Sequence, residues 1–100
     1  MAFTLLEKEL ASTSPERLSA TRLKVTHAIV QAQRANAAAI QLAPQTFATG
    51  KGYELPKPVA DTKLGEIVIR PSLGAESVDL YDWFALGSAN DGLTIIYETY

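Results

Sequence analysis

The sequence predicts an α+β domain, in which a long N-terminal helix packs on a small antiparallel sheet of two or three strands. No glycine or proline interrupts the alanine-rich stretch from residue 16 to residue 42, and alanine is the strongest helix former. Glycine and proline instead cluster between residues 43 and 62, and β-branched and aromatic residues follow them. This order is typical of a helix, a loop connection and then strands.

The composition limits the class of protein. One hundred residues with 47% hydrophobic content fit one globular domain. The absence of cysteine excludes a disulfide framework, a thiolate zinc site and a cysteine nucleophile. The charged residues Glu7, Lys8 and Glu9 follow too closely on the start for a signal peptide, and no apolar run could span a membrane. We therefore expect a soluble protein, either cytoplasmic or particle-associated.

The long helix is expected over residues 15–42. Ser14 is a suitable N-cap, Pro15 suits the first helical position, and Pro44 ends the pattern. An apolar face would contain Leu18, Val25, Ile29 and Ile40. Before this helix, residues 1–13 are expected to form an N-terminal arm with one or two helical turns, so that residues 14–100 make up the single domain.

Two strands are expected in the β-rich part, residues 63–100. Residues 65–73 contain three consecutive β-branched residues and end near Pro71. Residues 93–100 alternate, with Leu93, Ile95 and Tyr97 on one face. The sequence Asn90-Asp91-Gly92 before them is a turn signal.

Residues 76–87 remain ambiguous between two structures. As a strand they would complete a three-stranded antiparallel meander covered by the helix. As a helix they would begin after Ser77, a suitable N-cap, and end at Gly87. Short apolar runs do not distinguish these two structures.

Aromatic and acidic residues gather in the last 25 positions, which hold five of the eight aromatic side chains and five of the eleven acids. Tyrosine and tryptophan with carboxylates around them resemble the anchors and polar rim of a protein interface. The apolar side of the N-terminal arm also suits docking. The candidate partner-binding residues are Tyr81, Trp83, Asp79, Asp82, Tyr100, Phe3 and Leu6.

A basic stripe is expected on the polar face of the long helix. It comprises Arg17, Lys24, His27 and Arg34. Such a stripe could follow a phosphate backbone, but the chain has a net charge of −2 and the stripe has no interleaved aromatic residues for base stacking. A solvated face, or attraction to the acidic C-terminal half, explains it better than nucleic-acid binding.

No arrangement in the sequence predicts catalysis, a cofactor or a metal. His27 has no nucleophile motif near it and is expected to be a solvated surface histidine. Residues 49–52 resemble only a fragment of a phosphate-binding loop and are expected to form a flexible loop. Asp79 and Asp82 show no sign of the burial or the oxygen cage that acid–base chemistry or a cation would require.

These observations favour a non-enzymatic protein–protein interaction or assembly protein that self-associates or joins a larger complex, such as a viral particle. One alternative is a small inhibitor or regulatory protein that covers a basic surface with its acidic, aromatic residues. Another is a small enzyme or ligand-binding domain that uses Asp79, Asp82 and Tyr81. Nucleic-acid binding through the basic stripe is a further alternative.

Overall fold

The computed structural model describes residues 3–46, 52–59 and 63–100, and it is nearly all β. The larger sheet has the strand order β1 (Thr4–Glu9), β9 (Gly92–Thr99), β3 (Lys24–Ala32) and β6 (Glu66–Ile69), with β7 (Val78–Asp79) also paired to β3. The smaller sheet has the order β2 (Glu16–Arg17), β8 (Phe84–Leu86), β4 (Ile40–Ala43) and β5 (Tyr53–Leu55). All strand pairs are antiparallel.

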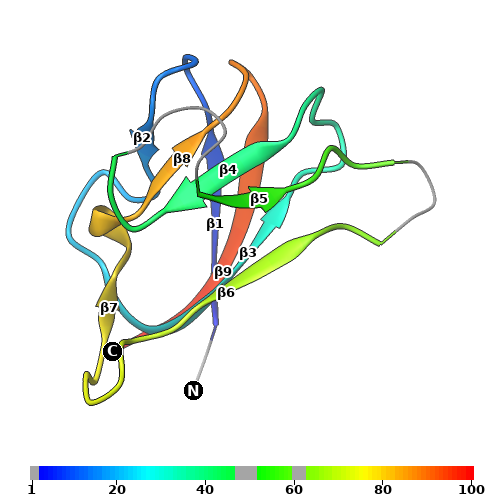
Figure 1. Cartoon of the computed structure of the whole chain (residues 1–100). Coiled ribbons are helices and arrows are strands. Elements are labelled where there is room, and N and C mark those ends of the chain that lie inside the picture. Colours follow the sequence, from blue (N-terminus) through cyan, green and yellow to red (C-terminus); the bar gives the residue numbers. More distant parts are fainter. Residues whose placement is uncertain (1–2, 47–51, 60–62) are drawn as a thin grey trace.

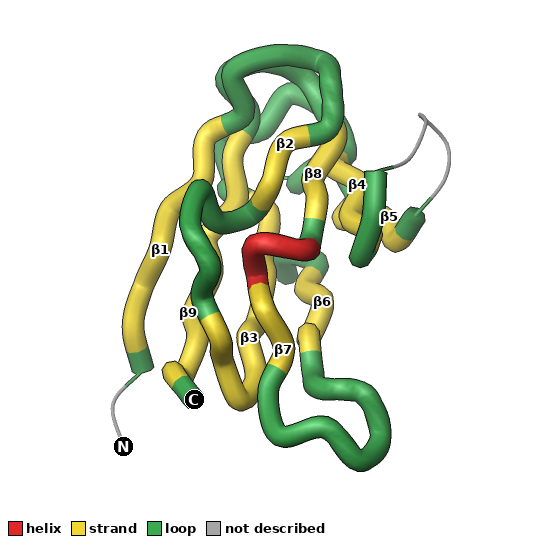
Figure 2. Tube along the Cα trace, turned by 90° about the vertical axis from the view of Figure 1, so that its left-hand side faces the viewer, coloured by secondary structure: helices red, strands yellow, loops and turns green. Residues whose placement is uncertain are grey.

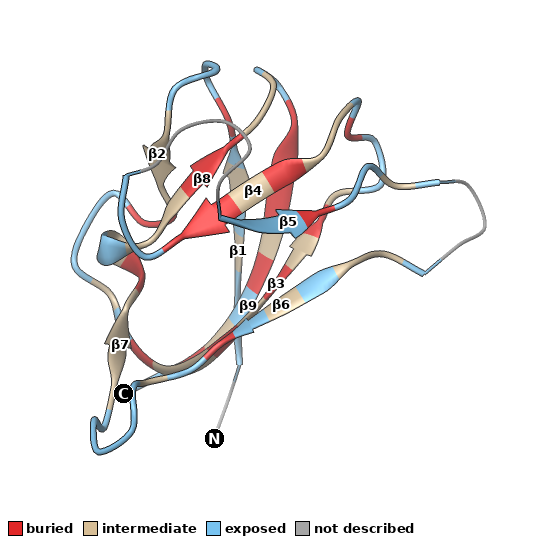
Figure 3. Ribbon diagram, viewed as in Figure 1, coloured by how far each residue is buried: buried red, intermediate tan, exposed pale blue. Residues whose placement is uncertain are grey.

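The two sheets pack face to face around one hydrophobic core (Figure 1). The larger sheet contributes Val30 and Ile95, and the smaller sheet contributes Leu42 and Ala85, all fully buried. Burial is concentrated where the two layers meet, whereas the loops at both ends are mostly exposed (Figure 3). A core between two sheets replaces the expected core between a helix and a sheet.

The α+β prediction is wrong, because residues 15–42 form three strands and their loops rather than one helix. In β3 the buried residues are Val25, Ala28, Val30 and Ala32. A bulge between Val25 and His27 inserts one residue into the strand. Buried residues of a regular strand are two positions apart, but the bulge places Val25 and Ala28 three positions apart. This spacing resembles the repeat of a helix.

The expected helix start at Ser14 is also wrong, and the Glu16 carboxylate shows why. One of its oxygens accepts hydrogen bonds from the backbone N–H groups of Ala11 at 2.8 Å and Ser12 at 3.0 Å. The other oxygen binds Lys8 Nζ at 3.1 Å. Glu16 therefore closes the loop before it and joins it to β1, instead of opening a helix after it.

The alanine-rich residues 35–39 form a loop because distant groups bind their backbone. The buried Asp91 carboxylate accepts hydrogen bonds from Ala37 N–H at 2.9 Å and Ala38 N–H at 3.1 Å. In a helix these amides would instead donate to backbone carbonyls of the preceding turn. A carboxylate more than 50 residues away in the sequence thus overrides the helical propensity of alanine.

A buried asparagine fastens this loop to the start of β9. The Asn36 side chain donates to Gly92 O at 2.9 Å and accepts from Gly92 N–H at 2.7 Å. A Cβ at position 92 would lie 2.4 Å from the Gln33 side chain and 3.1 Å from Lys8 O. A side chain at position 92 would therefore have to displace the Gln33 side chain and would crowd the Lys8 carbonyl, so glycine fits this position best.

The C-terminal strand predictions are confirmed as β6 and β9, but their expected pairing is wrong. Each strand pairs with β3, not with the other in a meander. Residues 76–87 form neither a continuous strand nor a regular helix. They contain β7, the 3₁₀ turn η1 (Leu80–Asp82) and β8, so that they connect the two sheets (Figure 2).

The N-terminal residues and the expected loop connection also contain strands. Residues 4–9 form edge strand β1 paired to β9, not helical turns. Within residues 43–62, Tyr53–Leu55 is β5, and Leu55 is buried in the core. Thr49, Gly50 and Lys51 of the expected flexible loop lie outside the described residues.

Candidate functional site

The predicted acidic and aromatic cluster binds groups of its own chain. One oxygen of Asp79 accepts hydrogen bonds from Leu23 N–H and Tyr81 N–H, both at 2.9 Å, and so caps η1. Its other oxygen lies 3.4 Å from Arg22 Nη1. Partial burial opposes ionisation of Asp79, but these hydrogen bonds and the Arg22 charge outweigh it and lower the pKa of the carboxyl. Asp79 therefore stabilises a turn.

Two arginines lie close to the Tyr81 ring. The guanidinium carbon of Arg17 lies 3.8 Å from the ring centroid, and that of Arg22 lies 4.4 Å from it. Arg17 also donates to Tyr81 O at 2.7 Å, and Arg22 forms an ion pair with Asp82 at 2.8 Å. The acids and the aromatic ring are thus already paired with cations, which leaves them little capacity to bind a second basic surface.

Trp83 and Tyr100, the other aromatic candidates of the C-terminal cluster, differ in exposure. Trp83 is half-buried and packs against the core, while its carbonyl accepts a hydrogen bond from Leu18 N–H at 2.9 Å. Tyr100 is 62% exposed, and its hydroxyl donates to Glu76. This hydrogen bond raises the pKa of the Tyr100 hydroxyl. The cluster expected as one binding surface is therefore divided between the core and the surface.

The basic stripe does not exist as one row, since the helix that would carry it is absent. Arg17 lies on β2 of the smaller sheet, whereas Lys24 and His27 lie on β3 of the larger sheet. Arg34 lies in the turn after β3, where its guanidinium donates to Val59 O at 3.4 Å. These four residues therefore offer no continuous track for a phosphate backbone.

The two candidates on β1 and just before it have different surroundings. Phe3 is 54% exposed, and its ring meets the His27 ring edge-on with centroids 5.4 Å apart. Leu6 is partly buried against the core. Phe3 therefore belongs to the outer surface of the larger sheet, and Leu6 belongs to its inner surface.

Four aliphatic side chains lie opposite one another across the outward face of the larger sheet. The register pairs Leu5 on β1 with Ile96 on β9. It then pairs Ile96 with Ile29 on β3, and Ile29 with Val68 on β6. Leu5 is 60% exposed, Val68 42% and Ile96 40%. Residues paired in this way lie on the same face of a sheet, so they form one apolar band across four strands, here called the aliphatic row.

Mostly polar residues border the aliphatic row on both sides, each two positions before or after the row residue on its strand. On one side the register aligns Glu7, Thr94, Gln31 and Glu66. On the other side His27 pairs with Glu98, and Phe3 and Arg70 continue that line at its two ends. We call the first line the acidic flank and the second line the mixed flank, because the second contains the buried Glu98 as well as Arg70. With the aliphatic row between them they form the outer face.

Sequence reasoning missed the aliphatic row. Ile96 and Val68 were recognised as strand residues, but their partners Leu5 and Ile29 were assigned to an arm and a helix. The signal was present in the alternation itself: Ile96 must face away from Leu93, Ile95 and Tyr97. Without the strand order, however, nothing indicated that four such residues would meet.

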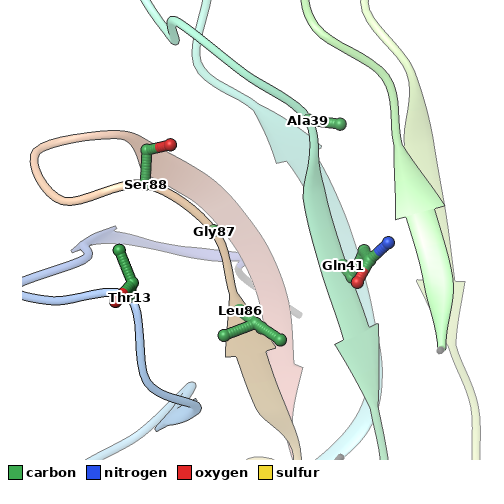
Figure 4. Close-up of a pocket in the computed structure, with 6 residues that line it drawn as sticks. All are labelled: Thr13, Ala39, Gln41, Leu86, Gly87 and Ser88. Carbon is green, nitrogen blue, oxygen red and sulfur yellow. The ribbon is translucent and has the colours of Figure 1, made fainter. Parts of the chain in front are cut away.

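Hollows elsewhere on the surface are shallow. One of about 280 Å³ is lined by Thr13, Ala39, Gln41, Leu86, Gly87 and Ser88 (Figure 4). Its lining offers hydroxyl and amide groups for hydrogen bonds but no ionisable side chain. A second, of about 540 Å³, lies beside the outer face and is bordered by His27 and Arg70.

The only histidine lies at the edge of that second hollow, on the mixed flank. Its Nδ1 is 3.3 Å from the Thr26 hydroxyl, which is also 3.0 Å from a Glu98 carboxylate oxygen. Within residues 3–46, 52–59 and 63–100, no group of three histidine, aspartate or glutamate side chains is arranged to hold a metal ion.

Comparisons with protein-family models, with curated proteins and with solved structures found no match to this chain. In the part of the chain that the structure describes, no helix has the length and apolar character needed to cross a lipid bilayer. The geometry of the outer face is therefore the strongest guide to function.

Proposed function

We propose that this chain is a non-enzymatic protein-interaction and assembly module that binds protein through the outer face of its larger sheet. The observation that supports this proposal is the aliphatic row. Three of its four members are at least 40% exposed, and they lie in register on adjacent strands. Contiguous exposed apolar surface of this kind, bordered by polar residues, marks interaction sites in folded proteins.

The chemistry of the outer face also favours a protein over a small ligand. The face is a sheet surface with an apolar centre and charged borders, which is the anatomy of a protein interface. Ligand pockets are concave and enclose most of the ligand, whereas the aliphatic row lies on open strands. A protein with a flat apolar surface and charges of both signs would fit it.

Site-specific photo-crosslinking tests this proposal. A photoreactive phenylalanine analogue replaces Ile96 on the outer face, and in a matched control it replaces Tyr53, which is 62% exposed on the smaller sheet. After irradiation in extract of the source cells, position 96 should form a defined protein adduct and position 53 should not. An absence of adducts at position 96, or equal adducts at both positions, would refute the proposal.

A further inference from the structure

We propose that the outer face binds the same face of a second copy of this chain, in a two-fold symmetric dimer. This inference rests on the proposed function, because it names the partner of the same surface. The argument comes from the placement of charge about the aliphatic row.

The two flanks are arranged symmetrically about the aliphatic row. On β6, Glu66 lies two residues before Val68, and Arg70 lies two residues after it. On β3, Gln31 and His27 are placed in the same way about Ile29. At about 3.3 Å per residue, each flank is roughly 7 Å from the row. On β6 a carboxylate on one side is thus matched by a guanidinium at an equal distance on the other. The carboxylate on the Arg70 side, Glu98 of β9, is only 9% exposed and accepts a hydrogen bond from Thr26.

Two-fold symmetry converts this arrangement into complementary contacts. Two copies can meet face to face only if the axis lies in the plane of the interface. When the axis runs along the aliphatic row, each row residue meets its own copy and the strand direction is reversed. Glu66 then faces the partner's Arg70, and Arg70 faces the partner's Glu66. The strands of the two sheets remain aligned, as they do in sheet-on-sheet packing.

Charge disfavours an axis parallel to the strands. Such an axis would place β6 of one copy over β1 of the other without exchanging the flanks. Glu66 would then lie over the partner's Glu7, and like charges placed together weaken association. The axis along the row instead places each Glu66 against an Arg70 of opposite charge.

The size of the face indicates a weak dimer. Four strands spaced about 4.8 Å apart, and five residues along each strand, cover about 19 Å by 17 Å. The projected area of about 320 Å² is smaller than the roughly 800 Å² that each partner buries in a standard stable interface. We therefore expect a dimer that dissociates on dilution through the micromolar range.

Charge reversal at the exposed residues Glu66 and Arg70 tests the dimer. Glu66→Arg alone creates two Arg–Arg contacts per dimer, and Arg70→Glu alone creates two Glu–Glu contacts. Each variant should weaken self-association about 10-fold or more, since two pairs are lost and replaced by repulsion. The double variant Glu66→Arg/Arg70→Glu should regain wild-type affinity. An equimolar mixture of the two single variants should form a heterodimer.

Analytical ultracentrifugation at several concentrations gives these affinities. Matched controls are Glu54→Arg and Lys57→Glu, which make the same charge changes at exposed positions in and just after β5, and they should leave the affinity unchanged. A wild-type chain that stays monomeric, or single variants that do not form the heterodimer, would overturn the inference. If position 96 still crosslinks to a different protein, the proposed function stands; if position 96 captures nothing, both proposals fail.

Discussion

Replacing Asp91 by alanine should destabilise the fold more than any surface charge change. Asp91 is 5% exposed, and its two carboxylate oxygens hold the amides of Ala37 and Ala38. This contact fixes the loop between β3 and β4, and therefore one of the connections between the two sheets. The perturbation removes both acceptors at once without creating a large cavity.

The magnitude follows from the two hydrogen bonds. A bond to a charged acceptor contributes roughly 1.5–3 kcal/mol. Ala37 is exposed and Ala38 half-buried, so water replaces part of each lost bond, and removal of the charge also relieves the cost of burying it. We expect a net loss of about 2–3 kcal/mol from a total stability of roughly 5–15 kcal/mol. This loss corresponds to a decrease in Tm of roughly 10–20 °C for a domain of this size.

Urea unfolding followed by the fluorescence of Trp83, the single tryptophan, measures the effect. Asp91→Asn retains one carbonyl acceptor and should cost about half as much as Asp91→Ala. Asp82→Ala removes an exposed ion pair with Arg22 and should change stability by less than about 1 kcal/mol. An Asp91→Ala protein within about 0.5 kcal/mol of the wild type would refute the proposed role of this carboxylate as the loop anchor.

Three further predictions concern other parts of the fold. Gly92→Ala should cost about 1–3 kcal/mol because its Cβ would collide with the Gln33 side chain, and Gln33→Ala in the same chain should restore part of the loss in urea unfolding. Asp79→Ala should destabilise the fold by about 1–2 kcal/mol through loss of the η1 cap. Arg22→Ala should change the unfolding midpoint little, because the Arg22 side chain is 65% exposed. Equal effects of the two variants would contradict the assignment of Asp79 as the cap. The pKa of Glu16 is lowered, because hydrogen bonds from Lys8 and two backbone amides outweigh the opposing effect of burial. The stabilisation that the ionised Glu16 carboxylate provides is therefore complete above the unfolded-state pKa of about 4.3 and is lost as the pH falls through the folded-state pKa. Glu16→Gln should flatten the decline of the unfolding midpoint with pH below about pH 5. An unchanged slope of midpoint against pH would contradict this role of Glu16.

Local sequence patterns predicted those strands in which the β-branched run or the alternation of buried and exposed residues is uninterrupted. Ile67, Val68 and Ile69 are consecutive β-branched residues, and Leu93, Ile95 and Tyr97 alternate without a break, so β6 and β9 could be recognised. The same reasoning failed for β3 because the bulge at residues 25–27 shifts the alternation by one residue. It failed for residues 35–39 because the deciding interaction comes from Asp91, which no local pattern reveals.

The candidate site was harder to predict, since every part of it depends on strand pairing. The carboxylates of Asp79 and Asp82 looked available in the sequence, but Arg22 lies 57 and 60 residues away and pairs with both. The aliphatic row draws one residue from each of four strands that are far apart in the sequence. Only the register shows that Leu5, Ile29, Val68 and Ile96 share one surface.

The most direct test of the outer face as the contact surface is a dilution series followed by methyl NMR. Methyl signals of Leu5, Ile29, Val68 and Ile96 should shift together as the protein is concentrated through the micromolar range. Signals of Leu42 and Leu55, buried in the smaller sheet, should stay constant. Signals that do not depend on concentration, or shifts confined to residues around Tyr81 and Arg22, would contradict the proposal that this chain associates through the outer face.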